Sequence, residues 1–268
     1  MDLTLVAMLL ALGAVIGFAA GLLGIGGGML TVPFMMLLFT ALKFPAQHIV
    51  HMAIATSLAT IMFTSISSVR AHHRRGAVLW PVALRLAPGI LAGSLAGAWL
   101  ASALPTHWLA LLFALFVGFS ATQMLLDRRP QPTRQLPGTA GMLAVGCAIG
   151  VASAIVGAGG AFLSVPFMTW CNVRVHNAVA TSASLGFPIA AAGTLGYVIS
   201  GWHLTGITPG AIGYVHVPAL VTLAAVSVLT APLGARVAHS LDTRGLKRVF
   251  ALLLYLLAGY MLHKAVRG

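Results

Sequence analysis

Two glycine-rich segments with nearly the same sequence contain the residues of this chain best suited to bind a ligand. Residues 17–35 read GFAAGLLGIGGGMLTVPFM and residues 150–168 read GVASAIVGAGGAFLSVPFM, with ten identities at an offset of 133. A helix that starts after such a run exposes unpaired N–H groups and the positive end of its dipole, and glycines let that backbone approach an oxyanion closely. The glycines predicted to contact an anion are Gly24, Gly26, Gly27 and Gly28 in the first segment and Gly157, Gly159 and Gly160 in the second.

A second duplicated motif adds hydroxyl groups after each glycine run. At an offset of 125, HMAIATS at 51–57 matches HNAVATS at 176–182. Hydroxyls within a span often bond back to the preceding turn of their own helix, which is the alternative to a role in binding. Their duplication beside the glycine runs makes them candidate anion donors, namely Thr56, Ser57, Thr181 and Ser182.

His51 and His176 stand at equivalent positions, five residues before each Thr-Ser pair. A histidine can donate to an oxyanion or carry a coupling proton near neutral pH, so both are candidates for a gate or for proton coupling. Satisfied histidines at the membrane interface are the alternative. The charge pattern described below places these two near opposite membrane faces.

The scarcity of carboxylates narrows the chemistry further. Asp2, Asp127 and Asp242 are the only acidic residues, and all lie at span ends or in loops. A divalent-metal carrier would need carboxylates beside its histidines, a proton relay would need Asp or Glu in the membrane, and a Ser-His-Asp hydrolase would need its third member there. We therefore expect no metal, no cofactor and no enzymatic activity, and an anionic substrate.

The amino-acid composition is that of a protein embedded in the lipid bilayer. Hydrophobic residues make up 59% and charged residues 7% of the 268 residues, and the mean hydropathy is +1.00. The net charge of +12 resides in short loops between apolar stretches, which indicates topology signals that meet lipid headgroups and not nucleic-acid binding. Cys147 and Cys171 lack metal-type spacing and are interpreted as small buried hydrophobic residues.

Apolar spans are expected at 3–23, 50–69, 86–104, 108–126, 139–156, 178–199, 213–235 and 249–262. The first is expected to be retained and not cleaved as a signal peptide.

The repeats divide the chain into two transmembrane halves. The first covers 3–127, the second covers 139–264, and the polar, proline-rich segment 128–138 links them on the cytoplasmic side. We expect an all-α polytopic fold in which each half has a first helix, a glycine break, a short helix and three longer spans. The expected helices are 3–23, 29–41, 47–70, 78–103 and 107–126 in the first half, and 139–156, 161–172, 175–199, 211–238 and 245–263 in the second.

Basic loops predict that the two halves are inverted in the membrane. The loop after 47–70 is strongly basic whereas its counterpart after 175–199 is uncharged, and the loop near Pro105 is uncharged whereas its counterpart at 236–248 is basic. Under the positive-inside rule, inversion requires the short helix to count as a crossing and places the N-terminus outside. Of the fifteen Lys and Arg residues, only Lys43, Lys264 and Arg267 then fall outside.

Two further features concern packing and closure. Lone glycines such as Gly93, Gly97 and Gly118 are expected to allow close helix packing. The stretch 206–218 has no counterpart in the first half, and with Tyr214 and His216 it is a candidate cover for the outer mouth.

The pattern GLLGIGGGMLTVPFMM, then AIATS, then RRG before a proline-containing span, repeated as GAGGAFLSVPFM and AVATS, closely resembles the TauE/SafE sulfite exporter family, also grouped as toluene-sulfonate uptake permeases. The resemblance covers nearly the whole chain. It implies an inner-membrane carrier of sulfur-containing or organic anions such as sulfite, sulfoacetate or related sulfonates. The chain departs from the family at Ala55 and Ala180, where Gly is common, and in its shorter second glycine run.

The combined prediction is a multi-pass transporter of the bacterial inner membrane that moves a small anion by alternating access between the two glycine breaks. Export is the favoured direction, because an inside-negative potential drives an anion outward at about 2.3 kcal/mol per charge per 100 mV. The alternatives are an anion channel, or an importer of an organic anion coupled to protons. The expected partners are the substrate and the bilayer, with no nucleic acid, and the oligomeric state stays open.

Overall fold

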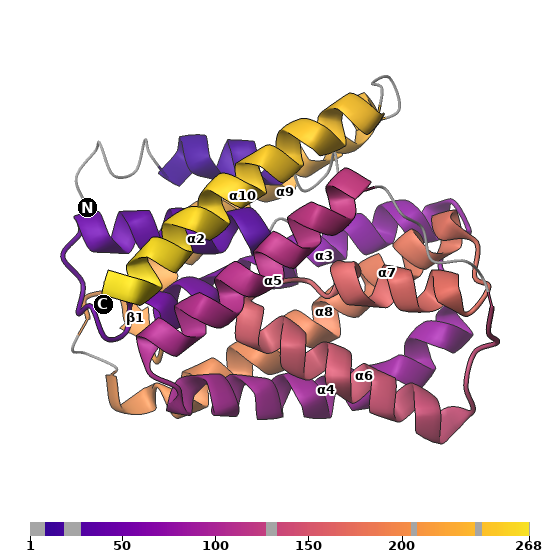
Figure 1. The fold of residues 1–268 in the computed structure, drawn as a ribbon, viewed down its shortest axis with the longest axis horizontal. Coiled ribbons are helices and arrows are strands. Elements are labelled where there is room, and N and C mark those ends of the chain that lie inside the picture. Colours follow the sequence, from indigo (N-terminus) through magenta and orange to yellow (C-terminus); the bar gives the residue numbers. More distant parts are fainter. Residues whose placement is uncertain (1–8, 19–27, 127–132, 205–207, 239–242, 268) are drawn as a thin grey trace.

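The computed structural model describes residues 9–18, 28–126, 133–204, 208–238 and 243–267. Within these ranges the chain forms helices that run mostly along the long axis of the molecule (Figure 1). The first half contains a helix at Leu9–Phe18, then α2 (Gly28–Ala41), α3 (Ile49–Arg74), α4 (Trp80–Ala103) and α5 (Thr106–Leu126). The second half contains α6 (Thr139–Val156), α7 (Ala161–Trp170), α8 (Val175–Ser200), the 3₁₀ turn Trp202–Leu204, strands β1 (Ala211–Ile212) and β2 (Val215–His216), α9 (Val217–Ala238) and α10 (Thr243–Arg267).

Six of the described helices are long and apolar enough to cross a membrane, so the chain is a multi-pass membrane protein. Most helix bounds lie within four residues of those expected from the sequence. The helix expected at 3–23 is described only over Leu9–Phe18, and both of its expected ends lie outside the described residues. The helix expected at 211–238 begins only at Val217. Residues 211–216 instead form a two-stranded hairpin, because Gly210 and Gly213 adopt φ values of +77° and +56° that turn the chain.

α3 and α8 form the centre of the bundle and carry the two Thr-Ser pairs. Leu58 of α3 lies against Gly193 of α8, and Ser65 lies against Gly186. Because the residue number falls along α8 as it rises along α3, the two helices are antiparallel. The equivalent helices of the two halves therefore run in opposite directions through the core.

The start of α6 and the end of α7, the two helices on either side of the second glycine break, lie at the same end of the molecule. The carbonyl of Trp170, at the end of α7, accepts hydrogen bonds from the amides of Thr133 (3.3 Å) and Arg134 (3.2 Å), which precede α6. The Trp170 indole also donates to the Thr133 hydroxyl at 2.8 Å, and the Arg134 guanidinium lies 4.9 Å from the indole ring. The short helix α7 thus reverses the direction of α6, and its ten residues span only about 15 Å, half the thickness of the hydrocarbon core. The expectation that the short helix counts as a crossing is therefore wrong for α7, and an odd number of crossings in this half rests on α8, α9 and α10.

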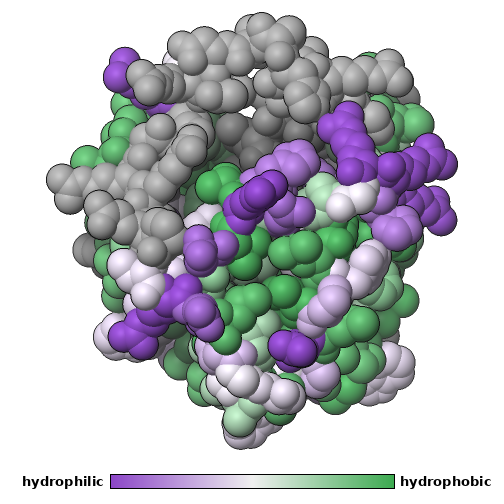
Figure 2. Space-filling view, turned by 90° about the vertical axis from the view of Figure 1, so that its right-hand side faces the viewer, coloured by the Kyte–Doolittle hydropathy of each residue, from purple (hydrophilic) through white to green (hydrophobic). Residues whose placement is uncertain are grey.

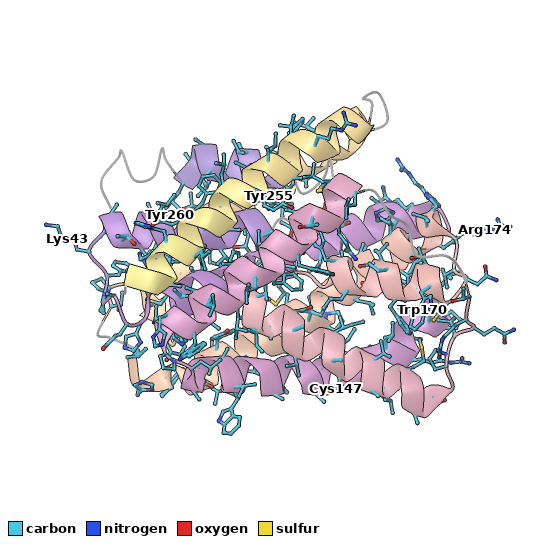
Figure 3. All side chains as sticks on the ribbon, viewed as in Figure 1. Lys43, Cys147, Trp170, Arg174, Tyr255 and Tyr260 are labelled. Atoms are coloured by element: carbon cyan, nitrogen blue, oxygen red, sulfur yellow. The ribbon has the colours of Figure 1, made fainter. Side chains whose placement is uncertain are left out.

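The cations that the charge pattern assigns to opposite faces lie at opposite ends of the molecule. Lys43 and Arg174 lie at the left and right ends in Figure 3. The Lys264 ammonium donates to the Thr40 hydroxyl at 2.7 Å, which places Lys264 at the end that carries Lys43. Figure 2 looks onto the other end, where hydrophilic residues gather around an apolar centre.

Glycines allow α4 and α6 to pack with their backbones in close approach. A Cβ at Gly93 would overlap the carbonyl oxygen of Cys147, and a Cβ at Gly97 would lie 2.6 Å from the carbonyl oxygen of Val151. In lipid no hydrophobic driving force brings helices together, because the lipid tails are as apolar as the side chains. Helices associate there through close packing at small residues. The predicted packing role is confirmed for Gly93 and Gly97. It is wrong for Gly118, because a Cβ there would meet nothing within 4 Å.

Gly93→Ala and Gly118→Ala are expected to change stability in opposite directions. Overpacking against Cys147 should lower the free energy of unfolding by about 1–3 kcal/mol at position 93. At position 118 the added methyl enters open space, and the higher helix propensity of alanine should stabilise the helix by about 0.5–1 kcal/mol. Thermal unfolding in detergent, followed by size-exclusion chromatography, measures both changes, and equal effects at the two sites would disprove the packing assignment.

Candidate functional site

The two glycine breaks meet in the interior of the bundle. A Cβ on Gly28, the first residue of α2, would overlap the carbonyl oxygen of Gly157 and lie 2.8 Å from the Ile61 side chain. Gly28 and Gly157 are both buried. Gly24, Gly26 and Gly27, which were also predicted to contact an anion, lie outside the described residues. The contact at Gly28 shows that the end of the first glycine run packs directly on the second.

The second break is a tight turn that only glycine can form without strain. Gly157 ends α6 with φ +70° and Gly160 precedes α7 with φ +75°, both in the left-handed region. The amide of Ala158 bonds the carbonyl of Ser153 at 3.1 Å, which closes the end of α6. The amides of Leu163 and Ser164 bond the carbonyl of Gly160 at 3.1 and 2.9 Å. The amides of Ala161 and Phe162 precede the first acceptor that a helix can supply, so the buried turn presents these donors and the positive end of a helix dipole.

The two predicted serines bind at the second break, Ser57 to its turn and Ser182 to the first turn of α7. Ser57 donates its hydroxyl to the carbonyl oxygen of Gly157 at 3.1 Å. Ser164 donates to the carbonyl oxygen of Gly160 at 3.0 Å, and its oxygen lies 2.7 Å from that of Ser182. Since the Ser164 hydrogen is already used, Ser182 is the donor in that pair. Both central helices therefore contact the second break through a serine.

The two predicted threonines instead connect the halves to each other. The hydroxyl oxygen of Thr56 accepts the amide of His216 at 3.1 Å, and that of Thr181 accepts the amide of Leu79 at 2.9 Å. Leu79 and His216 are equivalent residues of the two halves at an offset of 137, and each immediately precedes a helix, α4 or α9. The two bonds are thus a reciprocal pair, each of which supplies an acceptor to the start of a helix in the other half.

The two predicted histidines are far apart and differ in environment. His51 is buried near the start of α3, and its Nε2 lies 3.1 Å from the carbonyl oxygens of both Ala101 and Leu104. Because carbonyls only accept, Nε2 carries the hydrogen, and Nδ1 has no partner within the described residues. His176 is exposed near the start of α8, at the opposite end of the bundle (Figure 1). The two histidines thus lie at opposite ends of the bundle, and their placement at opposite membrane faces stays a prediction.

The hairpin closes the end of the bundle at which α3 begins. Tyr214 is buried, its ring stacks on His51 with 5.2 Å between centroids, and it contacts Tyr197 edge-on at 6.1 Å. Phe39 and Phe44 stack on each other, and His216 lies edge-on to both rings at 5.4 and 5.3 Å between centroids. Burial lowers the pKa of His216 despite a hydrogen bond to the Pro209 backbone. The predicted position of this insertion, covering one mouth, agrees with these contacts.

Two site residues escaped the sequence analysis. Ser153 of α6 is buried, its hydroxyl has no partner within the described residues, and its oxygen would lie 3.1 Å from a Cβ at Gly160. Its equivalent in the first glycine segment is Ala20, so comparison of the repeats gave no signal. Ser164 was detectable, because its equivalent at an offset of 133 is Thr31, also a hydroxyl residue.

The described site lacks acidic and metal-binding groups. All three carboxylates of the chain lie outside the described residues. Among the described residues no three His, Cys, Asp or Glu side chains are placed to hold a metal ion. What the site offers is backbone and hydroxyl donors at a buried helix start, within a multi-pass helical membrane protein. Such a broken-helix centre is characteristic of membrane transporters.

Comparison with known proteins identifies the family. The chain belongs to the Sulfite exporter TauE/SafE family, whose sequence profile matches residues 9–261. It is 33% identical over 256 residues to a probable membrane transporter protein of Haemophilus influenzae, covering 95% of this chain and 97% of that protein. It is 26% identical over 270 residues to the probable membrane transporter protein MJ0441 of Methanocaldococcus jannaschii, covering 97% and 96%. No solved structure matches the chain significantly. The protein is therefore a membrane transporter and not an enzyme.

Thr56→Val and Thr181→Val are each expected to lower the free energy of unfolding by about 1–2 kcal/mol, because a buried amide at a helix start loses its acceptor. Thr60→Val is the matched control, since Thr60 is equally buried but bonds only the Thr56 carbonyl of its own helix at 2.8 Å. Chemical unfolding in detergent compares the three. If the first two variants are as stable as the control, the bonds between the halves do not stabilise the fold.

Proposed function

We propose that this transporter exports a small sulfur-containing or organic anion, of the sulfite, sulfoacetate or sulfonate type, by alternating access. The observation that carries the proposal is the second glycine break, where a buried helix start lies beside the unpartnered hydroxyl of Ser153. A buried hydroxyl without a partner costs stability unless a ligand supplies one. An oxyanion is the ligand that satisfies the hydroxyl, the first amides of α7 and the helix dipole together.

The proposed binding site lies where the two breaks meet. Ser57 of α3 donates to the Gly157 carbonyl and Ser182 of α8 donates to Ser164. In the proposed bound state both hydroxyls rotate from these acceptors to the anion, so the substrate contacts both halves of the chain. Thr56 and Thr181 are adjacent and hold the neighbouring helix starts. The proposed anion-binding residues are Gly24, Gly26, Gly27, Gly28, Thr56, Ser57, Gly157, Gly159, Gly160, Thr181 and Ser182, with Ser153 added from the structure.

The choice of a sulfur oxyanion draws on the family. The profile that matches this chain is described as a sulfite exporter. A site made of backbone and hydroxyl donors without a fixed cation suits a tetrahedral or pyramidal oxyanion, which accepts several hydrogen bonds from different directions. Export along the inside-negative potential needs no coupling ion, since each negative charge gains about 2.3 kcal/mol per 100 mV.

We infer that the halves are inverted repeats, which alternating access would exploit by rocking one half against the other. Antiparallel α3 and α8 and the reciprocal bonds at Thr56 and Thr181 support this relation. With the N-terminus outside, the end that carries Arg174 faces the cytoplasm, and the hairpin closes the outer mouth. The proposed location is the bacterial inner membrane, and in this orientation the basic loops of the chain lie on its cytoplasmic side.

Import coupled to protons is the second candidate, and one observation favours it. His51 is buried with its Nδ1 unpartnered within the described residues, beneath the hairpin that closes the mouth. A proton bound there would accompany substrate entry from the outside. Under this candidate, transport by a His51→Gln variant would lose its dependence on a pH gradient, whereas a uniport exporter would show no such dependence in either form.

Purified protein in liposomes is expected to show saturable flux and counterflow of at least one of sulfite, sulfoacetate, a sulfonate, thiosulfate or a simple carboxylate. Ser153→Ala should raise the KM for that anion about tenfold or more, because it removes a hydrogen bond to a charged ligand. Its melting temperature should stay the same or rise, because the hydroxyl has no partner among the residues that the structure describes.

The control for Ser153→Ala is Ser120→Ala on α5, where the hydroxyl is equally buried and unpartnered but distant in the sequence from both breaks. An unchanged KM in both variants would refute the assignment of Ser153. Flux that never saturates and shows no counterflow would instead identify an anion channel.

Single cysteines at positions 72 and 244 are expected to react from the same, cytoplasmic side of the membrane. His72→Cys and Arg244→Cys would be made in a chain with Cys147 and Cys171 replaced by serine, with Lys43→Cys as the control that reacts from the outside. Labelling of intact cells with an impermeant maleimide distinguishes the sides. Reaction of positions 72 and 244 from opposite sides contradicts the inverted arrangement.

A further inference from the structure

Two clefts open beside the last turns of α3, at the end of the bundle viewed in Figure 2. The first has a volume of about 400 Å³ and lies between α3, α4 and α8. The second has a volume of about 430 Å³ and lies between α3 and α9. Ile66 and Arg70 line both clefts, so the two are adjacent along one edge of α3.

The clefts are lined mainly by apolar side chains that the fold leaves exposed. Leu84 and Phe187 line the first cleft, Phe63 lines the second, and Ile66 lies between them, with exposed fractions from 38% to 66%. A water-filled path for a small hydrophilic anion would not be lined in this way. Acyl chains match such a lining, because they gain by contact with apolar side chains as lipid tails do.

Arginines stand at the end of each cleft nearest the membrane surface. Arg70 lines both clefts and Arg74 lines the second, and at a spacing of four residues they share one face of α3. None of the described lining residues is acidic. Ser67, one turn deeper, adds a hydroxyl to the second cleft. The pair of guanidinium groups is thus available to a phosphate, which arginine binds in a bidentate manner.

The length of the clefts along α3 corresponds to one leaflet. From Arg74 to Phe63 the helix rises about 16 Å, and half the hydrocarbon core is about 15 Å. Trp80, which lines the first cleft, donates its indole N–H to His73 at 3.1 Å. Tryptophan concentrates at the headgroup level, so Trp80 places Arg70 and Arg74 at that level.

We propose that the clefts form a binding site for one anionic phospholipid. The phosphate lies between Arg70 and Arg74, and the two acyl chains descend on either side of Ile66, one in each cleft. Basic pockets between transmembrane helices on the cytoplasmic side bind anionic headgroups in this way. The site is separate from the glycine breaks and does not depend on the identity of the transported anion.

The test uses purified full-length protein in detergent with added phosphatidylglycerol or phosphatidylcholine. Native mass spectrometry should detect one retained phosphatidylglycerol per chain, and that lipid should raise the melting temperature more than phosphatidylcholine does. Arg70→Gln with Arg74→Gln should weaken phosphatidylglycerol retention about tenfold or more, while Arg174→Gln, at the same end of the bundle, should not. Ala87→Phe, which fills the first cleft and leaves both arginines in place, should also reduce retention.

Each remaining outcome contradicts the proposal. Equal retention of phosphatidylcholine would show that charge is not recognised. Protection by inorganic phosphate or sulfite as strong as that by phosphatidylglycerol would identify the clefts as an entrance for small anions. Undiminished retention in Ala87→Phe would show that no acyl chain occupies the first cleft, and an equal loss in Arg174→Gln would indicate a diffuse electrostatic attraction.

Discussion

The contact between the two glycine breaks is the constraint on which the rest of this fold depends. In lipid an unpaired backbone amide costs several kcal/mol, so a broken helix is tolerated only where protein surrounds it or a cavity is present. Gly28 meets Gly157 in the interior, and helices α3 and α8 enclose the turn between α6 and α7. Glycine at these positions serves two needs at once, because the turn requires positive φ at Gly157 and Gly160 and the crossing leaves no room for a Cβ at Gly28.

Hydroxyl groups on the central helices connect this crossing to the surrounding helices. Ser57 binds the Gly157 carbonyl of the turn and Ser182 binds Ser164 in the first turn of α7, whereas Thr56 and Thr181 accept the amides of the residues that precede α9 and α4. A displacement of α3 or α8 would therefore move groups both at the proposed substrate site and at a helix start in the other half. That coupling is what an alternating-access carrier requires, since a substrate must bias the equilibrium between two arrangements through differential contacts.

The two ends of the bundle differ in structure, although each half of the chain carries the same duplicated motifs. The hairpin between α8 and α9, with Tyr214 and His216 buried, covers the end where α3 begins. The other end carries arginines and two open apolar clefts. The insertion thus gives one end of the bundle an aromatic and histidine cover, whereas the other end presents a basic surface.

The sequence alone determined the membrane class, the family and most of the described helix bounds, because apolar length and duplicated motifs are local properties of the chain. The two-part organisation, and the orientation that loop charge indicates, stay predictions. It also predicted that the glycines and the Thr-Ser pairs surround one anion site; Gly28 and Ser57 do contact Gly157, and the anion site itself stays a prediction. It could not assign the threonines to helix starts in the other half, since Leu79 and His216 are 102 and 160 residues away from their partners. It missed Ser153, whose equivalent is Ala20, and it extended α9 through the hairpin, where positive φ at Gly210 and Gly213 overrides an apolar pattern. Only the tertiary structure decided these points, because hydrogen-bond partners and the space beside a glycine arise when distant segments pack together, and no local pattern records them.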